Sequence, residues 1–221
     1  MNPLKNRIAF SILVIFGALT YLFAWSPVFE VSQIRVLGTP QYAKSSQIIE
    51  GAEIAIGDKL ARVEPRTITR RLSEFQWIKN VNLSRNWING TVTIEIAARV
   101  PVGIYGGKAL DATGALFEYP GEFASDLPHV SASTPNLGLR GISLFKALPS
   151  DLRASLISIS VPNESSIASR HKKSGGAFWV QWGSLEELPM KIRVYKALLQ
   201  LPENKDINNL NLSAPHAPIA R

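Results

Sequence analysis

The feature that most constrains this chain is a stretch of 22 residues without charge, from Ile8 to Phe29, near the amino terminus. Its first part, IAFSILVIFGALTYLFAW, is apolar apart from Ser11 and Thr20. A helix rises about 1.5 Å per residue, so roughly 20 such residues span the ~30 Å hydrocarbon core of a bilayer. The pattern therefore predicts a transmembrane helix over residues 8–28.

Two other interpretations of this segment are a cleaved signal peptide and a helix buried in a soluble core. A signal peptide usually has an apolar region of about 7–15 residues followed by small residues. This segment is longer and ends in the bulky sequence WSPVF at residues 25–29. A soluble core helix is disfavoured because the segment is apolar all round and shows no polar face. We therefore expect a retained anchor.

The charges at the two ends of the segment predict its orientation. Lys5 and Arg7 precede it, and the first charge after it is Glu30. Cytoplasmic flanks of membrane helices are enriched in Lys and Arg, so residues 1–7 are expected to form a short cytoplasmic tail. The bulk of the chain is then expected outside the cytoplasm, in a single-pass (type II) protein of the cell membrane whose partners include the lipid bilayer.

Composition limits the chemistry of the remaining residues. The chain has no cysteine, which excludes disulfides, thiolate catalysis and zinc–sulfur sites. His129, His171 and His216 are far apart and lack the spacing of metal ligands. The motifs GxSxG and HExxH are absent. We therefore expect a protein that is not an enzyme and has no cofactor, metal site or small-molecule substrate.

The net charge of +7 is spread thinly along the chain. Nucleic acid is one class of partner for such a charge, but on an exported chain attraction to anionic lipid or wall polymer is the simpler interpretation. Solubility alone explains the charge about as well. We expect no nucleic-acid partner.

Local patterns predict an α+β unit after the anchor. Residues 31–37 alternate as a strand does, and residues 44–49 and a segment that begins at Pro65 favour helices. Residues 80–84 and 92–96 alternate on either side of Asn89-Gly90, a signal for a hairpin with a type I′ turn. The order strand–helix–helix–strand–strand suits two helices on one face of a three-stranded sheet.

Short strands and turns follow after residue 99. Residues 131–141 are rich in Ser, Thr, Pro, Asn and Gly and are predicted to form a surface loop. The four tryptophans near strands are mostly expected to pack in the core or at its rim: Trp77, Trp87, Trp179 and Trp182. The other expected elements are an Asp111 turn between strands at 110–117, helical spacing at 144–156 interrupted at Pro149, strands at 157–161 and 178–182, a hairpin tip at 171–176, a helix from Pro189, and a closing strand at 207–213 ended by Pro215 and Pro218.

Taken together, these features resemble the FtsQ/DivIB family of bacterial cell-division proteins. Family members have a short cytoplasmic tail, one transmembrane helix, a membrane-proximal POTRA domain and a β-rich second domain. The segments that carry the resemblance are FEVSQIRVLG (29–38), GDKL (57–60), WIKNV through RNW (77–87), RVPV (99–102), LDATG (110–114), WGS (182–184) with Lys191, Ile192, Leu198 and Leu199, and NNLNLSAP (208–215).

The resemblance implies an α+β fold and a domain order along the chain. Residues 1–7 would be the cytoplasmic tail, 8–28 the transmembrane helix, 29–98 the POTRA domain, 99–213 the FtsQ-type β domain and 214–221 a C-terminal tail. It also implies a non-enzymatic scaffold of the divisome at the division septum, which links septal proteins and helps control septal peptidoglycan synthesis. The implied partners are membrane proteins of the FtsB/DivIC and FtsL types.

A final strand at the edge of a sheet has unpaired N–H and C=O groups to which a partner strand can add. The candidate contact residues are Asn209, Leu210, Asn211, Leu212, Ser213 and Pro215. The segment could instead be a plain closing strand, or a strand capped by its own tail. Two other functional classes are a POTRA-bearing transport or envelope-assembly factor, which normally carries several POTRA units, and a membrane-tethered wall hydrolase, which needs a catalytic constellation.

Overall fold

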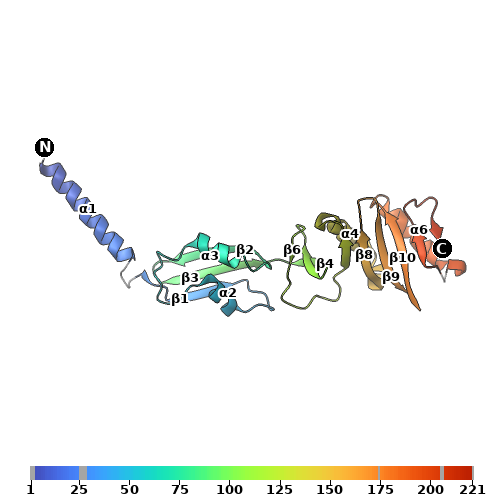
Figure 1. Cartoon of the computed structure of the whole chain (residues 1–221), viewed down its shortest axis with the longest axis horizontal. Helices are drawn as coiled ribbons and strands as arrows, with labels where there is room; N and C mark the ends of the chain where they lie inside the picture. Colours follow the sequence, from blue (N-terminus) through green and yellow to red (C-terminus); the bar gives the residue numbers. More distant parts are fainter. Residues whose placement is uncertain (1–2, 25–28, 174, 205–206, 221) are drawn as a thin grey trace. The chain divides into compact units, whose positions relative to one another are not determined.

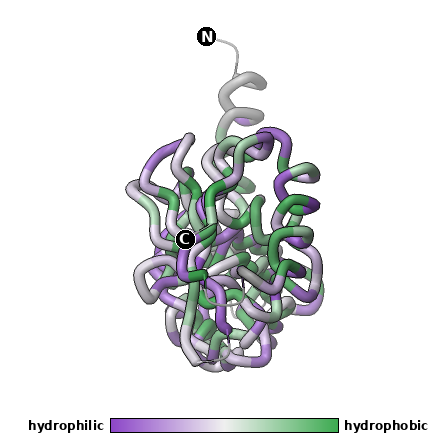
Figure 2. Tube along the Cα trace, turned by 90° about the vertical axis from the view of Figure 1, so that its right-hand side faces the viewer, coloured by the Kyte–Doolittle hydropathy of each residue, from purple (hydrophilic) through white to green (hydrophobic). Residues whose placement is uncertain are grey.

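A computed structural model describes residues 3–24, 29–173, 175–204 and 207–220 of the chain. The chain divides into two compact units, Met1–Arg99 and Val100–Arg221. Figure 1 shows the elements of each unit in the colours of the sequence, and Figure 2 shows that hydrophilic residues occupy many of the outer loops. Both units combine helices with sheets, so the predicted α+β class is confirmed.

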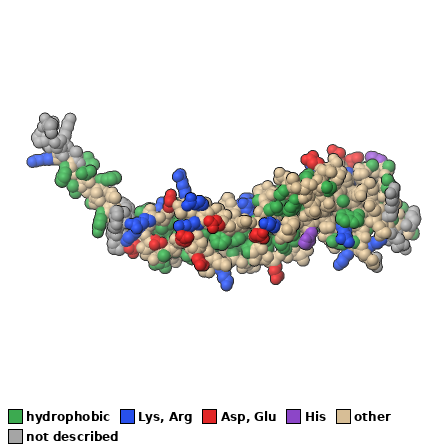
Figure 3. All heavy atoms as spheres, in the orientation of Figure 1, with side chains coloured by type: hydrophobic (Ala, Val, Ile, Leu, Met, Phe, Trp, Pro, Cys, Tyr) green, Lys and Arg blue, Asp and Glu red, His purple; other side chains and the backbone are tan. Residues whose placement is uncertain are grey.

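The first helix, α1 (Pro3–Ala24), contains most of the apolar segment. It begins within the predicted tail of residues 1–7, and its apolar side chains are largely exposed, as with Phe10 at 67% and Phe16 at 70% (Figure 3). Of the helices in the described residues, none is long and apolar enough to cross a membrane. The predicted transmembrane helix is therefore not confirmed, and its last residues, 25–28, lie outside the described residues.

The rest of unit 1 is a three-stranded sheet with two helices. The strand order is β1-β3-β2, with β1 parallel and β2 antiparallel to the central β3. α2 contacts β1, and α3 contacts β2. The elements follow one another in the predicted order: β1 (Gln33–Leu37), α2 (Ser45–Ala52), α3 (Pro65–Leu72), β2 (Ile78–Asn86) and β3 (Thr91–Ala98).

The periodicity of apolar residues determines which face of this sheet meets the helices. Val92 and Ile94 of β3 are fully buried, as are Ile48 of α2 and Leu72 of α3. Residues two apart on a strand share a face, whereas residues on one helical face recur every three or four positions. α3 begins with Pro65 in its first turn, where the missing N–H leaves no hydrogen bond unmade.

The connection between β2 and β3 is longer than the predicted two-residue turn. Asn86 pairs with Thr91, so the loop consists of residues 87–90. Gly90 has a φ of +67°, whereas the φ of Asn89 is not positive. A type I′ turn needs positive φ at both central residues, so the predicted turn type is wrong. The Asn86 carboxamide oxygen instead accepts the Ile88 N–H at 3.0 Å and stabilises the longer loop.

Unit 2 contains a mixed nine-stranded sheet with the order β12-β11-β10-β9-β8-β7-β4-β5-β6. The pairs β4/β7, β7/β8 and β10/β11 are parallel, and the others are antiparallel. The strands are β4 (Pro101–Tyr105), β5 (Lys108–Asp111), β6 (Leu116–Phe117), β7 (His129–Ala132), β8 (Leu156–Val161), β9 (Ile167–Lys173), β10 (Gly176–Gly183), β11 (Asn209–Asn211) and β12 (Ile219–Ala220).

Helices connect two of the three parallel pairs in unit 2, because parallel strands need a crossover between them, whereas β5, β6 and a loop lie between β4 and β7. α4 (Pro135–Ala147) and α5 (Ser150–Ser155) join β7 to β8. α6 (Leu188–Gln200), with the short 3₁₀ turn η2 (Pro202–Asn204), joins β10 to β11. The helices and one face of the sheet share a single core that includes Ile142 of α4, Tyr195 of α6, Ile159 of β8, Val180 of β10 and Leu210 of β11.

The surface loop predicted at residues 131–141 is wrong, because this segment contains the end of β7 and the beginning of α4. Thr134 is the N-cap residue, and its hydroxyl accepts the Leu137 N–H at 3.3 Å, with Pro135 in the first turn. Ser, Thr, Pro and Asn are common both in loops and at helix starts. The composition of residues 131–141 therefore fits a loop and a helix start equally well, and here it belongs to a helix start.

Two further boundaries differ from the sequence-based expectations. The predicted hairpin tip at 171–176 begins too early, since β9 continues to Lys173 and buries His171 completely. α6 begins at Leu188, one residue before the predicted start, and Pro189 lies in its first turn. Proline is tolerated there because the first N–H groups of a helix have no partner within it.

Candidate partner-binding site

The predicted contact strand lies near one end of the sheet in unit 2. β11 is parallel to β10, with Leu210 opposite Val180. The ladder extends beyond β11, because the Leu212 N–H donates to the Gln181 carbonyl at 2.7 Å. Leu210 and Leu212 are fully buried. The side chains of Leu210 and Leu212 therefore belong to the core of unit 2.

β11 is not the edge strand that the sequence predicted, because β12 pairs with its outer side. Leu210 lies opposite Ala220, and Asn211 lies opposite Ile219. The predicted closing strand at 207–213 is shorter, and Pro218 precedes a new strand within the predicted tail. The arrangement is that of a strand capped by its own tail. Within the described residues, the cap consists of Ile219 and Ala220.

The backbone of β11 has groups that face away from β10. The Asn208 carbonyl accepts the Trp179 N–H at 3.0 Å, and the Leu212 N–H donates to Gln181. Successive residues of a strand direct their N–H and C=O groups to opposite neighbours. The backbone groups of Asn209 and Asn211 therefore face β12, and these are the groups that a partner strand would need.

The side chains of the six predicted residues divide into a buried set and an outward-facing set. Asn209 and Asn211 are half-buried on the outer face, and Ser213 is exposed. The Ser213 N–H and hydroxyl both donate to the Asn211 Oδ1 atom, at 2.9 and 2.7 Å, which closes the turn after β11. The buried set, which packs within the unit, is Leu210, Leu212 and Pro215.

A buried chain of hydrogen bonds links β10, β9 and α5. The Trp182 indole N–H donates to Ser169 Oγ at 2.7 Å, and Ser169 Oγ lies 2.7 Å from His171 Nε2. His171 Nδ1 lies 3.0 Å from Ser155 Oγ, which donates to the Leu152 carbonyl. One tautomer satisfies every group: Nδ1–H donates to Ser155, and Nε2 accepts the Ser169 hydroxyl proton. The ring is therefore neutral.

The surroundings of His171 favour this neutral form. Phe178 stacks on the ring, with centroids 5.5 Å apart, and Tyr195 packs against it at a tilt, with centroids 6.2 Å apart. Burial lowers the pKa of His171 from 6.5 to about 4, and burial also raises the pKa of the Tyr195 hydroxyl. Desolvation penalises the charged form of each side chain. This part of unit 2 thus depends on uncharged polar groups.

Lys191 of α6 is a second buried polar group, with only 1% of its surface exposed. Its Nζ donates to the carbonyls of Trp182 and Ser184, at 2.8 and 2.9 Å. Burial lowers the pKa of this amine, whereas Glu187 and Glu186 raise it. The contacts join the beginning of α6 to the end of β10, and so hold the crossover that places β11.

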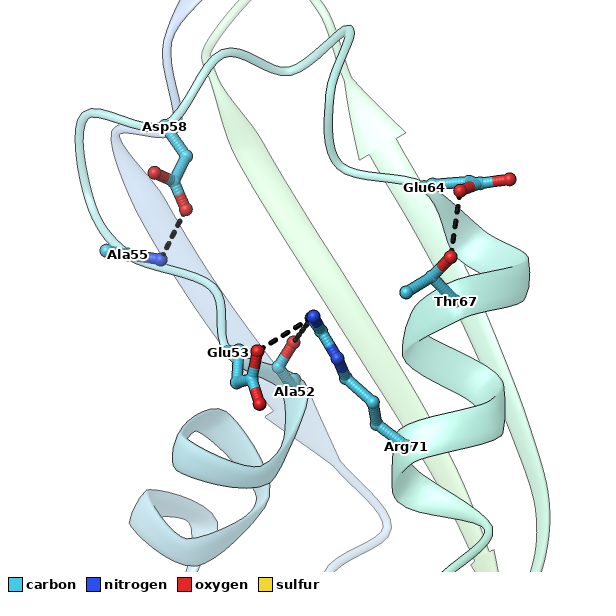
Figure 4. A network of polar contacts seen from close by, with 7 residues as sticks. All are labelled: Ala52, Glu53, Ala55, Asp58, Glu64, Thr67 and Arg71. Carbon is cyan, nitrogen blue, oxygen red and sulfur yellow. Dashed lines mark hydrogen bonds and ion pairs between the residues drawn. The ribbon is translucent and has the colours of Figure 1, made fainter.

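Unit 1 has a hollow of about 410 Å³ between the end of α2, the loop after it and α3 (Figure 4). Arg71 extends from α3 so that Nη2 lies 2.7 Å from Glu53 Oε2 and Nη1 donates to the Ala52 carbonyl at 3.2 Å. The Asp58 carboxylate accepts the Ala55 N–H at 2.7 Å. These contacts stabilise the loop and hold the two helices together.

The three histidines are separated in the fold. His129 is exposed at the start of β7, His171 lies between two serines, and His216 Nε2 is 3.6 Å from Glu187 Oε1. Within the described ranges, no group of three or more His, Asp or Glu side chains is placed to hold a metal ion.

Sequence reasoning missed two features of this region. β12 has only two residues, too few to show an alternating pattern. The sequence places most of the four tryptophans in the core or at its rim, whereas Trp179 is 40% exposed, with the Arg170 guanidinium 5.9 Å from its ring centroid. The alternation of Phe178, Val180 and Trp182 was the available signal, because it places Trp179 on the opposite face.

Comparisons with known proteins give consistent results. A family model described as "POTRA domain, FtsQ-type" matches residues 29–99. The cell division protein FtsQ of Corynebacterium glutamicum is 28% identical over 102 residues, which are 46% of this chain and 45% of that protein. The cell division protein FtsQ of Salinibacter ruber is 28% identical over 111 residues, 49% of this chain and 41% of that protein. The matched part thus spans less than half the length of either relative.

Proposed function

Because the chain carries an FtsQ-type POTRA domain and is a member of the FtsQ/DivIB family, we propose that it is a scaffold of the bacterial divisome. It would act by binding other septal membrane proteins, of the FtsB/DivIC and FtsL types, and so help control septal peptidoglycan synthesis. This role requires protein surfaces rather than catalytic groups.

The observation that supports this role most directly is the weak cover over β11. The outward backbone groups of Asn209 and Asn211 are opposed by a two-residue strand at the end of the chain. A longer partner strand would form more ladder hydrogen bonds than β12 does, and main-chain hydrogen bonds provide the affinity in this mode of recognition. We propose that a partner strand displaces β12 and pairs with β11.

A pair of variants at one position tests this mechanism. Asn211→Pro removes the outward N–H but leaves the Leu212 N–H on Gln181, whereas Asn211→Ala keeps the N–H and removes only the side chain. We expect co-purification of the FtsB/DivIC-type and FtsL-type proteins to be lost with Asn211→Pro and kept with Asn211→Ala. If the proline variant is folded and recovers both partners, strand addition at β11 is refuted.

Depletion of the protein distinguishes the functional classes. Filamentous cells without septa are expected for a division scaffold. Normal septa combined with a secretion defect would instead favour a transport or envelope-assembly factor, and would refute the scaffold.

We also propose that residues 8–28 anchor the protein in the cell membrane, with residues 1–7 in the cytoplasm and both units outside. The support is the charge-free sequence and the exposed apolar side chains of α1. In spheroplasts, external protease should digest unit 2 if the orientation is as proposed. Full protection, or release of the protein from membranes by carbonate at high pH, would contradict the anchor.

A further inference from the structure

Two loops of unit 1 each expose an isoleucine to solvent. Ile88, in the loop between β2 and β3, is 98% exposed, and Ile56, in the loop between α2 and α3, is 73% exposed. Among the described residues of unit 1 outside α1, these are the two most exposed large apolar side chains. Single exposed apolar residues are common on protein surfaces, so the position of the two loops decides whether these have a role.

The loop that carries Ile56 is hydrogen-bonded to the first residues of unit 1 after α1. The Gly57 N–H donates to the Val31 carbonyl at 2.9 Å, and the Val31 N–H donates to the Asp58 carbonyl at 2.8 Å. The Asp58 carboxylate holds the same loop closed by accepting the Ala55 N–H (Figure 4). Neighbouring Cα atoms are about 3.8 Å apart, so Ile56 lies close to residue 31.

The loop that carries Ile88 is attached to the same segment. The Ser32 N–H donates to the Gly90 carbonyl at 2.8 Å. The Trp87 ring packs edge-on against the Phe29 ring, with centroids 6.0 Å apart. Both loops therefore lie beside residues 29–32, and the two exposed isoleucines belong to the same end of unit 1.

This end of unit 1 is the one that follows the proposed membrane anchor, residues 8–28, on which the inference rests. Phe29 is the next residue in the chain, and a chain advances at most about 3.6 Å per residue. The headgroup layer on each side of the hydrocarbon core is roughly 5–8 Å thick. The loops bonded to residues 29–32 are therefore within reach of that layer.

A hollow of about 480 Å³ beside Ile88 carries positive charge. It is lined by the guanidinium groups of Arg35 and Arg85 and by polar side chains that include Asn86 and Thr91, and none of its described lining residues is acidic. A guanidinium pairs with a phosphate through parallel hydrogen bonds. Basic residues close to a membrane surface are attracted to anionic lipids. The hollow is therefore complementary to a lipid phosphate.

We propose that unit 1 docks on the outer surface of the bilayer through these two loops. Ile56 and Ile88 enter the boundary between headgroups and acyl chains, Trp87 lies at the headgroup level that tryptophan prefers, and Arg35 contacts lipid phosphates. A single covalent link to the anchor leaves unit 1 free to turn, whereas two further contacts beside it restrain that rotation. The docking would thus set the orientation of unit 1 against the membrane.

A protein partner fits these loops less well than a lipid surface does. Protein interfaces have a continuous, closely packed apolar centre. Here the apolar side chains are single residues in two separate loops, next to Gly57 in one and Asn89 in the other. Isolated apolar side chains next to basic groups suit a fluid, anionic surface.

Fluorescence quenching by lipid tests the docking, because the chain has no cysteine and a single introduced thiol is labelled uniquely. The full chain carrying Ile56→Cys or Ile88→Cys is labelled with bimane and reconstituted in vesicles of phosphatidylethanolamine and phosphatidylglycerol. A fraction of these lipids is brominated near the headgroup end of the acyl chains. We expect at least twofold more quenching at positions 56 and 88 than in the matched control, Leu37→Cys.

The control residue Leu37 is apolar and 50% exposed, at the far end of β1. It lies five residues beyond Ser32, about 16 Å along the strand. The same dye at this position shows what the dye itself does near a membrane. Thermal unfolding midpoints show whether each variant is folded.

The charge contribution has its own test at position 88. Arg35→Gln should lower the quenching of this label roughly twofold, and so should phosphatidylcholine in place of phosphatidylglycerol. Unchanged quenching in both would refute the phosphate contact. The vesicles hold only lipid and this chain, so quenching there cannot come from a protein partner.

A label at Leu13→Cys, within the proposed anchor, separates failure of the docking from failure of the anchor. Quenching at position 13 without excess quenching at positions 56 and 88 would overturn the docking and leave the anchor intact. No quenching at position 13 would refute the anchor, and the docking with it. Neither result changes what is expected of partner binding at β11.

Discussion

The neutral His171 makes the stability of unit 2 depend on pH in a defined window. In the unfolded chain the ring takes up a proton near pH 6.5, whereas in the folded protein burial lowers its pKa to about 4. The unfolded state therefore binds more protons between these values, and stability falls as pH falls from 6.5 to 4. The loss relative to neutral pH is about 0.7 kcal/mol at pH 6, about 2 kcal/mol at pH 5 and about 3 kcal/mol at pH 4.

The structural reason is that protonation leaves the Ser169 hydroxyl without its acceptor. With a proton on Nε2, Ser169 would have to accept from both Trp182 and His171 and lose its own acceptor. Carboxylates titrate mostly below pH 5, so measurements between pH 7 and pH 5 separate the histidine contribution from theirs.

Denaturant unfolding at pH 7, 6 and 5 is the assay, with His171→Leu as the comparison. The variant lacks the titrating ring but leaves Ser169 bonded to Trp182 and Ser155 bonded to Leu152. The wild-type chain should lose about 2 kcal/mol more than the variant between pH 7 and pH 5. The ring resonances, followed by NMR, should titrate near pH 4. A folded-state titration near pH 6.5, or equal losses in both proteins, would refute the reasoning.

Other predictions concern buried polar groups and glycine geometry. Lys191→Met leaves the Trp182 and Ser184 carbonyls without their donor, and we expect a loss of about 2 kcal/mol in the free energy of unfolding, measured in denaturant; an unchanged midpoint would contradict the role of these contacts. Gly38→Ala places a methyl group in a steric clash with the Ile96 carbonyl oxygen, whereas Gly57→Ala meets nothing within 4 Å. Both glycines have positive φ, so both variants share backbone strain of about 1 kcal/mol. Thermal unfolding should show a much larger loss for Gly38→Ala, and equal losses would argue against the close approach.

Elements with strong local signals could be predicted from the sequence. The Pro65 helix start and the β2–β3 hairpin follow from residues close together in the chain. The Asp111 turn is also local, since its Oδ1 accepts the Thr113 N–H at 2.8 Å and the Ala115 N–H at 3.0 Å. In each case short-range hydrogen bonding and backbone preference favour the same local structure, so the sequence pattern predicts it.

The candidate site was less predictable because it depends on long-range pairing. Nothing in residues 207–213 indicates that Ile219 and Ala220 return beside Leu210 and Asn211. The hydrogen bonding of His171 likewise depends on Ser155 of α5, which lies in another element. The charged run at 171–173 resembles a turn in isolation, and only the packing of β9 decides otherwise.

The parallel pairing of β1 with β3 has a consequence for synthesis on the ribosome. Gln33 pairs with Thr91, so roughly sixty residues must be made after β1 before its neighbour exists. At about 5–20 residues per second this takes several seconds, whereas the β2–β3 hairpin closes within about 10 μs once both strands are available. Unit 1 therefore completes its sheet only when β3 emerges. A chain terminated before residue 91 would leave β1 and β2 exposed together, as two edges without the strand that separates them.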